Sequence, residues 1–237
     1  MSDSQSLVSS RFYDEISGTY SSVYSERVRY NLAVDNYLRL HPKFASFKNV
    51  LDIGSGNGDR ITKLFSNKAR IVAVEESTAM CSLLRKHRGI ERVIESSINR
   101  ITSGDLGADF DLVTMQWNVL GHISDHISLL ELCRDVLKSN GRLVFDVNNP
   151  LNAKQYGVKS VINNYIYFNI YPRKEKKTFT FNLGRHKTQV SYSPASYYVR
   201  ILQQFGFQEI ECSYFDYETG KPAGCYSGQI LFDAVKE

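Results

Sequence analysis

A glycine-rich segment in the first third of the chain is the strongest candidate for chemistry. It reads Asp52-Ile53-Gly54-Ser55-Gly56-Asn57-Gly58 and begins within an apolar stretch, residues 50–53. Glycines let the backbone turn sharply and let a ligand approach the main chain closely. A dinucleotide-binding turn would need another glycine at position 59, where this chain has Asp59. Acidic residues flanking the turn would also repel a pyrophosphate at a helix N-terminus, which disfavours a nicotinamide-dependent oxidoreductase.

A carboxylate lies further along, at the end of a second apolar stretch. Glu75 closes the predicted strand 70–75, where a carboxylate can accept hydrogen bonds from both hydroxyls of a ribose. Glu76 follows it, and its side chain should point to the other side of the strand. The alternative interpretation is that Glu75 binds no ligand and is only the solvent-exposed end of a strand.

The surrounding residues alternate between strand-like and helix-like patterns. Strands are predicted at 50–53, 70–75, 93–94, 111–115 and 142–147. One helix is predicted at 59–65 and a second directly after Ser77, its predicted N-cap. A third is predicted at 125–137, with Ser124 as its N-cap and Asn140-Gly141 as its end. Short connections between such elements are typical of parallel βαβ units. We therefore expect an α/β fold with a doubly wound, Rossmann-like, mostly parallel seven-stranded sheet and helices on both faces.

The pattern changes after Pro150. Residues 178–183 alternate between apolar and polar side chains, and residues 165–171 are the expected partner strand of a hairpin. Ser193-Pro194 should open a helix that Gly206 ends, and strands at 210–214 and 230–235 should close the sheet. One domain over 1–237 is expected: an N-terminal helical lid (1–48, with a helix at 27–40), a core (49–148), an inserted β-hairpin cap (149–193) and the closing helix and strands (194–237).

Together these segments resemble the class I S-adenosylmethionine-dependent methyltransferase family, small-molecule type. The resemblance rests on residues 50–58 and on Val72-Ala73-Val74-Glu75. Phe110-Asp111-Leu112-Val113-Thr114-Met115 and Gly141-Arg142-Leu143-Val144-Phe145-Asp146 complete it. It implies S-adenosylmethionine as the cofactor. That molecule has no phosphate and carries an ammonium and a sulfonium, so acidic neighbours suit it.

The resemblance also assigns cofactor contacts. Asp52, Gly54, Ser55, Gly56 and Gly58 would form the loop along the methionine part, and Glu75, with Glu76 beside it, would hold the ribose. Met80, Ser97 and Ile98 would lie near the adenine, and Gln116 and Trp117 beside the sulfonium. The family often has an aspartate near position 97, where this chain has Ser97.

Two residues are candidates for a direct part in catalysis. Methyl transfer is an in-line displacement, so positioning and desolvation can supply most of the acceleration. His122, just beyond the fourth strand, is a candidate base for an acceptor that must lose a proton, or else a structural histidine. The ring of Tyr20, in the N-terminal lid, is a candidate to stabilise the sulfonium, or else ordinary packing. The basic run from Arg173 to Lys177 could hold an acidic substrate, or be a solvated hairpin tip.

Composition limits the remaining choices. The chain has 237 residues and a formal net charge of +4, which permits an anionic partner without requiring one. Cys81, Cys133, Cys212 and Cys225 form no Cys-x-x-Cys pair, so we expect reduced thiols and no metal site. Without a visible leader or an apolar stretch of about 20 residues, a cytoplasmic protein is expected.

Three functions follow from these observations. The first is methyl transfer to a nitrogen or oxygen of a small molecule, such as an amine, an amino sugar or a secondary metabolite. The second is a tRNA-modifying methyltransferase, so nucleic acid is a less favoured partner. The third, from another class, is a non-catalytic S-adenosylmethionine-binding or scaffold protein. No membrane partner is expected, and the sequence leaves open whether the chain is a monomer or a homodimer.

Overall fold

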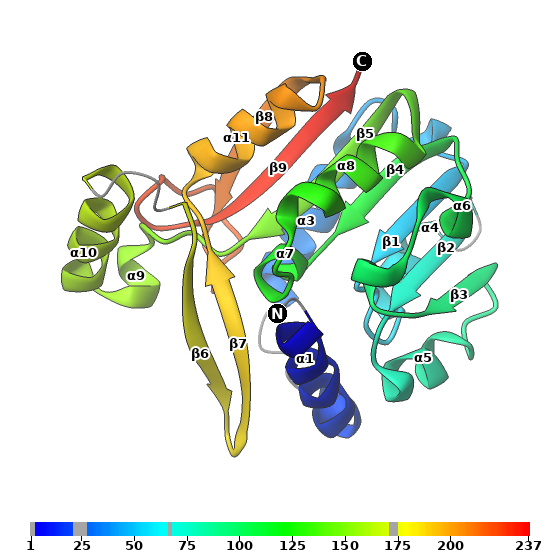
Figure 1. The fold of residues 1–237 in the computed structure, drawn as a ribbon. Helices are drawn as coiled ribbons and strands as arrows, with labels where there is room; N and C mark the ends of the chain where they lie inside the picture. The colour runs from blue at the N-terminus through cyan, green and yellow to red at the C-terminus, as the bar shows by residue number, and fades with distance from the viewer. Residues whose placement is uncertain (1–2, 21–27, 66–67, 171–174) are drawn as a thin grey trace.

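A seven-stranded sheet forms the centre of the molecule (Figure 1). The computed structural model describes residues 3–20, 28–65, 68–170 and 175–237. In spatial order the strands are β3 (Arg92–Glu95), β2 (Arg70–Glu75), β1 (Asn49–Ile53), β4 (Phe110–Met115), β5 (Leu137–Val147), β9 (Gln229–Lys236) and β8 (Phe207–Phe215). The first five are parallel, and β9 is antiparallel to both of its neighbours. The predicted doubly wound, mostly parallel sheet is confirmed.

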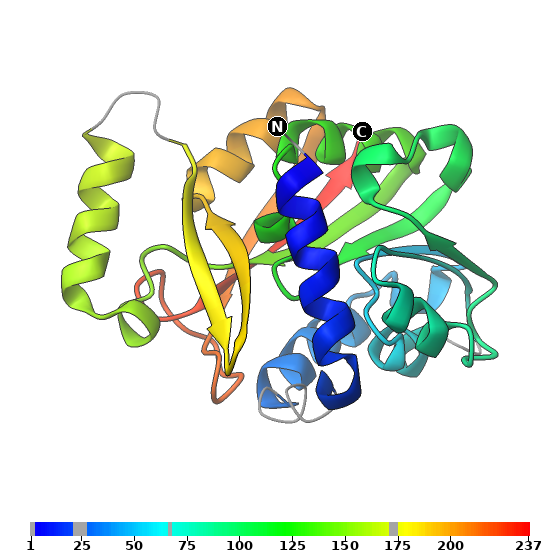
Figure 2. The same cartoon turned by 60° about the horizontal axis from the view of Figure 1, so that its bottom comes forward.

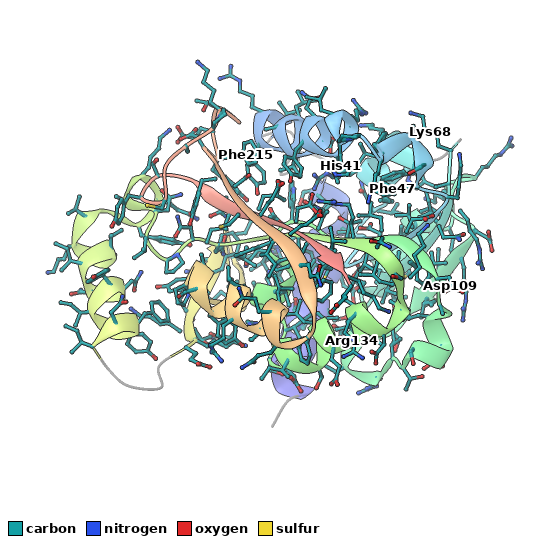
Figure 3. The ribbon with its side chains drawn as sticks, turned by 90° about the horizontal axis from the view of Figure 1, so that it is seen from above. His41, Phe47, Lys68, Asp109, Arg134 and Phe215 are labelled. Carbon is teal, nitrogen blue, oxygen red and sulfur yellow. The ribbon has the colours of Figure 1, made fainter. Side chains whose placement is uncertain are left out.

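Helices cover both faces of this sheet. Val50, Ile71 and Leu112 face α3 (Val28–Leu40) and α4 (Asp59–Phe65). Their neighbours along the strands pack on the other face with α8 (His126–Val136) and α11 (Ala195–Gln204). Figure 3 shows the two layers, with His41 and Phe47 on the α3 side and Arg134 on the α8 side. Shorter helical segments are η1 (Ser17–Thr19), η2 (Phe44–Ser46), α5 (Thr78–Leu84), η3 (Ile98–Arg100), α6 (Ser103–Leu106) and α7 (Val119–His122).

Helix α3 buries polar groups together with apolar ones. Tyr30, Val34 and Leu38 lie on one face at helical spacing and enter the core. Asn31 and Asp35 are buried beside them. Burial of an unpaired polar group is costly, so these two side chains must find partners within the fold. The predicted start of this helix, Arg27, lies outside the described residues.

Helix α1 (Asp3–Ile16) is fastened to the core through the start of α5. Ser77 caps α5 by accepting a hydrogen bond from the Met80 N–H at 3.1 Å, which confirms the predicted N-cap. The Asp14 carboxylate of α1 accepts from the Ser77 hydroxyl at 2.6 Å and from the Ala79 N–H at 3.0 Å. In Figure 2, α1 runs between α5 and the hairpin formed by β6 (Lys177–Leu183) and β7 (His186–Tyr192).

Two predicted helix starts are wrong by one residue. Helix α8 is capped by Asp125, whose carboxylate accepts from the Ser128 N–H at 3.0 Å, and not by Ser124. Helix α11 has Pro194 as its N-cap, where Ser193 was expected. A carboxylate and a hydroxyl are both good caps, so adjacent candidates are hard to separate from sequence.

The fifth strand begins earlier than predicted. Helix α8 ends at Val136 and β5 starts at Leu137, so Asn140-Gly141 lies inside the strand and does not end the helix. Asn140 has a φ of 60°, and the pairing of β5 with β4 shifts register between Phe110 and Leu112. An Asn-Gly pair inside a strand with a register shift is typical of a β-bulge.

The insertion after β5 contains the predicted hairpin, but with a different second strand. The pair is β6 (Lys177–Leu183) and β7 (His186–Tyr192), which follow one another directly. Residues 165–169, expected as a strand, belong to helix α10 (Val158–Asn169), which follows α9 (Ala153–Tyr156). A short apolar run does not distinguish strand from helix by periodicity alone. Arg173 and Lys174 of the basic run lie outside the described residues. Glu175 and Lys176 come just before β6 and Lys177 is its first residue, so these three are not at the tip of the hairpin, where Leu183 pairs with His186.

None of the helices in the described ranges is long and apolar enough to cross a membrane.

The loop between β8 and β9 should depend on a glycine that touches α3. Gly220 has a φ of 67°, and a Cβ there would lie 2.2 Å from the Arg29 carbonyl oxygen. We expect Gly220→Ala to lower the free energy of unfolding by about 2 kcal/mol or more, because backbone strain and a clash add. Chemical denaturation measures the change.

Gly184 provides the matched control. It has a φ of 58°, but a Cβ there would meet nothing within 4 Å. Gly184→Ala should therefore cost only the backbone strain, about 1 kcal/mol. Equal losses in the two variants would contradict the proposed contact between the loop and α3.

Candidate functional site

A cleft opens at the carboxyl ends of the parallel strands. Its open volume, which includes space continuous with solvent, is about 740 Å³. The walls come from the glycine-rich turn, the ends of β2, β3 and β4, and helix α1. Ligands of open α/β sheets bind at this edge, so the position itself favours a binding site.

The glycine-rich turn leaves room for close packing against its main chain. Gly56 has a φ of 56°, and a Cβ there would lie 3.0 Å from the Tyr20 hydroxyl. A larger residue would be strained and would displace Tyr20 from the cleft wall. The glycine is therefore required both by the backbone conformation and by its close packing against Tyr20.

Glu75 ties this turn to the end of β2. Its carboxylate accepts hydrogen bonds from the backbone N–H groups of Gly56 at 2.8 Å, Glu76 at 2.9 Å and Ser77 at 2.9 Å. Burial raises the pKa of Glu75, and the three N–H donors oppose that rise. A carboxylate has about four acceptor sites, so these bonds leave capacity for a ligand hydroxyl.

The turn after β4 adopts a rare backbone conformation. Trp117 and Asn118 have φ angles of 67° and 59°, in the left-handed region that side-chain-bearing residues seldom occupy. The Asn118 N–H donates to Asp146 Oδ1 at 3.0 Å, and the Tyr30 hydroxyl donates to Asp146 Oδ2 at 2.7 Å. Burial raises the pKa of Asp146. Asp146 and its partners thus hold a strained turn at the cleft wall.

Helix α3 fixes the side chains of the same turn. Trp117 Nε1 donates to Asn31 Oδ1 at 2.6 Å. The Gln116 amide oxygen accepts from Arg60 Nη1 at 3.0 Å, and Arg60 Nε donates to Asp35 Oδ1 at 2.7 Å. The two buried polar residues of α3 therefore find their partners at the end of β4, one directly and one through Arg60.

Aromatic and hydroxyl side chains close the cleft from the lid side. His122 Nδ1 lies 3.3 Å from the Ser9 hydroxyl, and its Nε2 lies 3.4 Å from the Tyr13 hydroxyl. Burial lowers the pKa of His122 to about 4, so the imidazole is neutral near pH 7. The Tyr20 and Trp117 rings lie 5.8 Å apart between centroids.

A second cavity, with an open volume of about 490 Å³, adjoins the first. The two share Tyr20, Gly54, Gln116 and Trp117 in their walls. Asp52, Ser55 and Arg60 line only the second. Burial raises the pKa of the Asp52 carboxyl to about 7.

Most residues singled out from the sequence meet in these cavities. The first is lined by Tyr20, Gly54, Gly56, Glu75, Glu76, Ser97, Ile98, Gln116, Trp117 and His122, and the second also by Asp52 and Ser55. Gly58 and Met80 line neither, because Gly58 packs against Leu84 and Met80 is wholly buried. Among the described residues, no group of three or more His, Cys, Asp or Glu side chains is placed to hold a metal ion.

The sequence analysis missed the residues that hold the turn after β4. These are Tyr30, Asn31, Asp35, Arg60, Asn118 and Asp146. One signal was available, since Asn31 and Asp35 interrupt the apolar face of a predicted helix. Polar residues on a core-facing stripe indicate a buried partner without saying which one.

Comparison with known proteins identifies the family. A model described as a methyltransferase domain matches residues 24–211, well over half of the chain. The chain therefore belongs to the methyltransferase-domain family.

The curated relatives match over only part of their length. The ubiquinone biosynthesis O-methyltransferase of Azotobacter vinelandii is 27% identical over 124 residues, 51% of this chain and 52% of the relative. Ribosomal RNA small subunit methyltransferase A of Thermosynechococcus vestitus is 30% identical over 132 residues, 52% of this chain and 48% of the relative. The chain thus spans about half the length of the curated relatives it matches.

Solved structures share the fold over nearly the whole chain. The complex of DhpI with S-adenosylmethionine and HEP has a TM-score of 0.68 at 16% identity, covering 99% of both chains. CalS10 of Micromonospora echinaspora, an amino pentose methyltransferase bound to S-adenosylmethionine, has a TM-score of 0.60 at 16% identity, covering 92% of this chain and 97% of that one. At such identities the likeness shows the fold.

The tryptophan at the turn allows a direct test of the α3 contact, because Trp117 is the single tryptophan of the chain. Asn31→Leu removes the acceptor of the indole N–H. We expect a red shift of the emission as the ring loosens, and a loss of about 1 kcal/mol in the free energy of unfolding. Asn36→Leu, exposed on the same helix, should change neither. An unshifted Asn31→Leu spectrum would contradict the role given to Asn31.

Asp52 should make the ligand-free protein less stable as pH rises. Its folded pKa of about 7 lies above the ordinary aspartate pKa of 3.8, so between these pH values the folded protein holds a proton that the unfolded chain releases. The free energy of unfolding therefore falls as pH rises through this window. We expect Asp52→Asn to be more stable than the parent by about 1–4 kcal/mol at pH 8, with little difference at pH 4.

Denaturant titrations at the two pH values measure this difference. Asp135→Asn, at an exposed carboxylate of α8, is the control and should show no such pH-dependent gain. A gain for Asp52→Asn that is the same at both pH values would contradict the assigned pKa.

Proposed function

We propose that the two cavities bind S-adenosylmethionine and that the protein transfers its methyl group to a nitrogen or oxygen of a small molecule. The observation that carries this proposal is the junction of Glu75, the glycine-rich turn and Trp117 in one cleft. Glu75 would hold the ribose hydroxyls. Ser97 and Ile98 would lie along the adenine, and Gly54, Gly56 and Gln116 along the chain that carries the sulfur. Asp52 and Ser55 would contact the part of the cofactor that enters the second cavity.

The residues present fit a cationic nucleoside ligand. Asp52 and Glu75 are both buried at the site, where burial disfavours their charged forms. A bound cation would offset that cost. S-adenosylmethionine supplies, when bound, a methyl group attached to a sulfonium. When the methyl group is transferred, the sulfur is left as a neutral thioether. The rings of Tyr20 and Trp117 lie beside the glycine turn, where their faces could stabilise positive charge.

The lid favours a small acceptor. Ser9, Ser10 and Tyr13 of α1 line the cleft, so this helix borders the site and would shield one side of a bound ligand from water. His122, neutral by burial, could accept a proton from an acceptor that must lose one. The names of similar proteins include a ubiquinone biosynthesis O-methyltransferase, which supports an oxygen acceptor, and an amino pentose methyltransferase, which supports an acceptor of the amino-sugar type.

The same proposal includes the division of the chain. We assign one methyltransferase domain over 1–237, in which 1–48 forms the lid, 49–148 the cofactor core, 149–193 the substrate cap and 194–237 the closing elements. Helices α9 and α10 and the β6–β7 hairpin make up the described part of the cap. Contacts between α1 and the cap support their joint role over the site: Glu15 pairs with His186 at 2.7 Å, and the Phe12 and Phe181 rings lie 6.2 Å apart.

Calorimetric titration with S-adenosylhomocysteine, the demethylated product, tests cofactor binding. We expect micromolar affinity for the wild-type protein. Glu75→Ala should weaken it at least tenfold, because a hydroxyl–carboxylate bond and the fixed turn are lost together. Glu95→Ala, at an exposed carboxylate ending the next strand, should bind normally. Unchanged affinity in Glu75→Ala would contradict the ribose assignment, and NADH binding in place of the product would contradict the cofactor.

Incubation with labelled S-adenosylmethionine and panels of amines, phenols, amino sugars and RNA tests the acceptor class. Transfer to members of the small-molecule panels is the expected result. Transfer to RNA alone, with strongly salt-dependent binding, would replace this proposal with an RNA-modifying function.

A further inference from the structure

The inserted cap contacts the site without lining it. None of its described residues, between 149 and 193, lies in the wall of either cavity. Strand β7 packs instead against helices α1 and α7, which both line the first cavity. The described part of the cap can therefore act on the site only through the elements that it contacts. One of these, α7, ends at His122.

Helix α7 is too short to satisfy its own carbonyl groups. It has four residues, and the last four carbonyls of a helix have no partner within that helix. Two side chains of the cap supply the missing donors. The Ser191 hydroxyl donates to the Gly121 carbonyl at 3.1 Å. Lys176 Nζ donates to the carbonyls of Ile123 at 2.8 Å and Ser124 at 3.1 Å.

These bonds hold the main chain on both sides of His122, since Gly121 precedes it and Ile123 follows it. The imidazole ring itself has longer contacts, 3.3 Å to the Ser9 hydroxyl and 3.4 Å to the Tyr13 hydroxyl. Hydrogen bonds in proteins usually measure about 2.7–3.2 Å and weaken beyond that length. The place of the ring therefore depends chiefly on the main chain that carries it.

Lys176 is held where a cation is favoured by carbonyl groups. Its side chain is half-buried, and burial lowers its pKa to about 8. In the part of the chain that the structure describes, its hydrogen bonds go to the two carbonyls and none goes to a carboxylate. A positive charge is stabilised at the carboxyl end of a helix, which is where these carbonyls lie. The cost of burying Lys176 is thus offset by its contact with the chain next to His122.

We propose that Lys176, together with Ser191, is a positioning residue that fixes His122 for proton removal from the acceptor, so that the cap acts on methyl transfer through this contact. The inference rests on the proposed function, because it gives His122 the role of base. His122 takes the proton that the acceptor oxygen or nitrogen releases. Lys176 lines neither cavity, so it orients the base and moves no proton itself.

The imidazole signals of His122 test the contact without any acceptor. Nitrogen NMR of the ring reports its tautomer and its pKa, and the signals lost in His122→Gln assign it. The wild-type protein should show one neutral tautomer and a pKa of about 4. Lys176→Met should raise this pKa toward the ordinary value of 6.5, because the ring is no longer held in a buried place. Lys176→Arg, which can donate to the same two carbonyls, should keep the wild-type signals.

A double-mutant cycle tests the effect on catalysis, with a phenol or amine that accepts the methyl group in the panels. Lys176→Met should lower kcat about 10- to 100-fold and leave KM for S-adenosylmethionine unchanged, because a displaced base slows the reaction without weakening cofactor binding. In a His122→Gln background the same substitution should change kcat less than about twofold, since the group that Lys176 positions is gone. Lys187→Met, at an exposed lysine of the same hairpin, should behave like the wild-type protein.

Ser191→Ala removes only one hydroxyl and gives an independent variant if Lys176→Met does not fold. It should change the His122 signals in the same direction. Wild-type signals in both variants would overturn the contact. Equal losses of kcat with and without His122, or the same loss in Lys187→Met, would overturn the positioning role.

The two measurements separate this inference from the proposed function. Methyl transfer to none of the acceptors would overturn the proposed function, and the catalytic role of Lys176 with it. The His122 signals would still decide whether Lys176 holds this histidine in place.

Discussion

The left-handed turn at Trp117 and Asn118 is the constraint on which the site depends. Two successive residues with side chains occupy a backbone region that costs free energy, and the first of them, Trp117, lines the wall of the cleft. The conformation persists because partners surround it: Asp146 accepts from the Asn118 N–H, and Asn31 accepts from the indole of Trp117. Helix α3 is therefore more than a cover for the sheet. It aligns the wall shared by both cavities.

Buried carboxylates set the electrostatics of the same region. Asp52, Glu75 and Asp146 all lie at or near the carboxyl edge of the sheet, and burial raises the pKa of each. Backbone N–H groups stabilise Glu75 and Asp146, whereas the Ser55 side chain and the positive charge of Arg60 favour the charged form of Asp52 and lower its pKa against the effect of burial. A site organised in this way is costly for the empty protein and favourable for a cation. Binding energy is then available from charges already in place, with little rearrangement.

The sequence predicts the frame of this site well and its supports poorly. Residues 50–58 were sufficient to place a strand and a turn, because an apolar run followed by spaced glycines has few other structures. Residues 165–169 were misassigned, because a short apolar run fits either a strand or a helix until its packing is known. The hydrogen bonds from α3 to the turn after β4 could not be predicted from the sequence, for a different reason. Asn31 and Trp117 are 86 residues apart, and only the tertiary fold brings them together.

A crystal structure of the protein with S-adenosylhomocysteine would test the central claim most directly. The account predicts the ribose hydroxyls within hydrogen-bond distance of Glu75 and the sulfur beside Trp117. It also predicts the turn at Trp117 and Asn118 in the conformation it already has, with its bonds to Asn31 and Asp146 intact. A ligand bound elsewhere, or a turn that rebuilds to admit it, would contradict the view that α3 organises the site in advance.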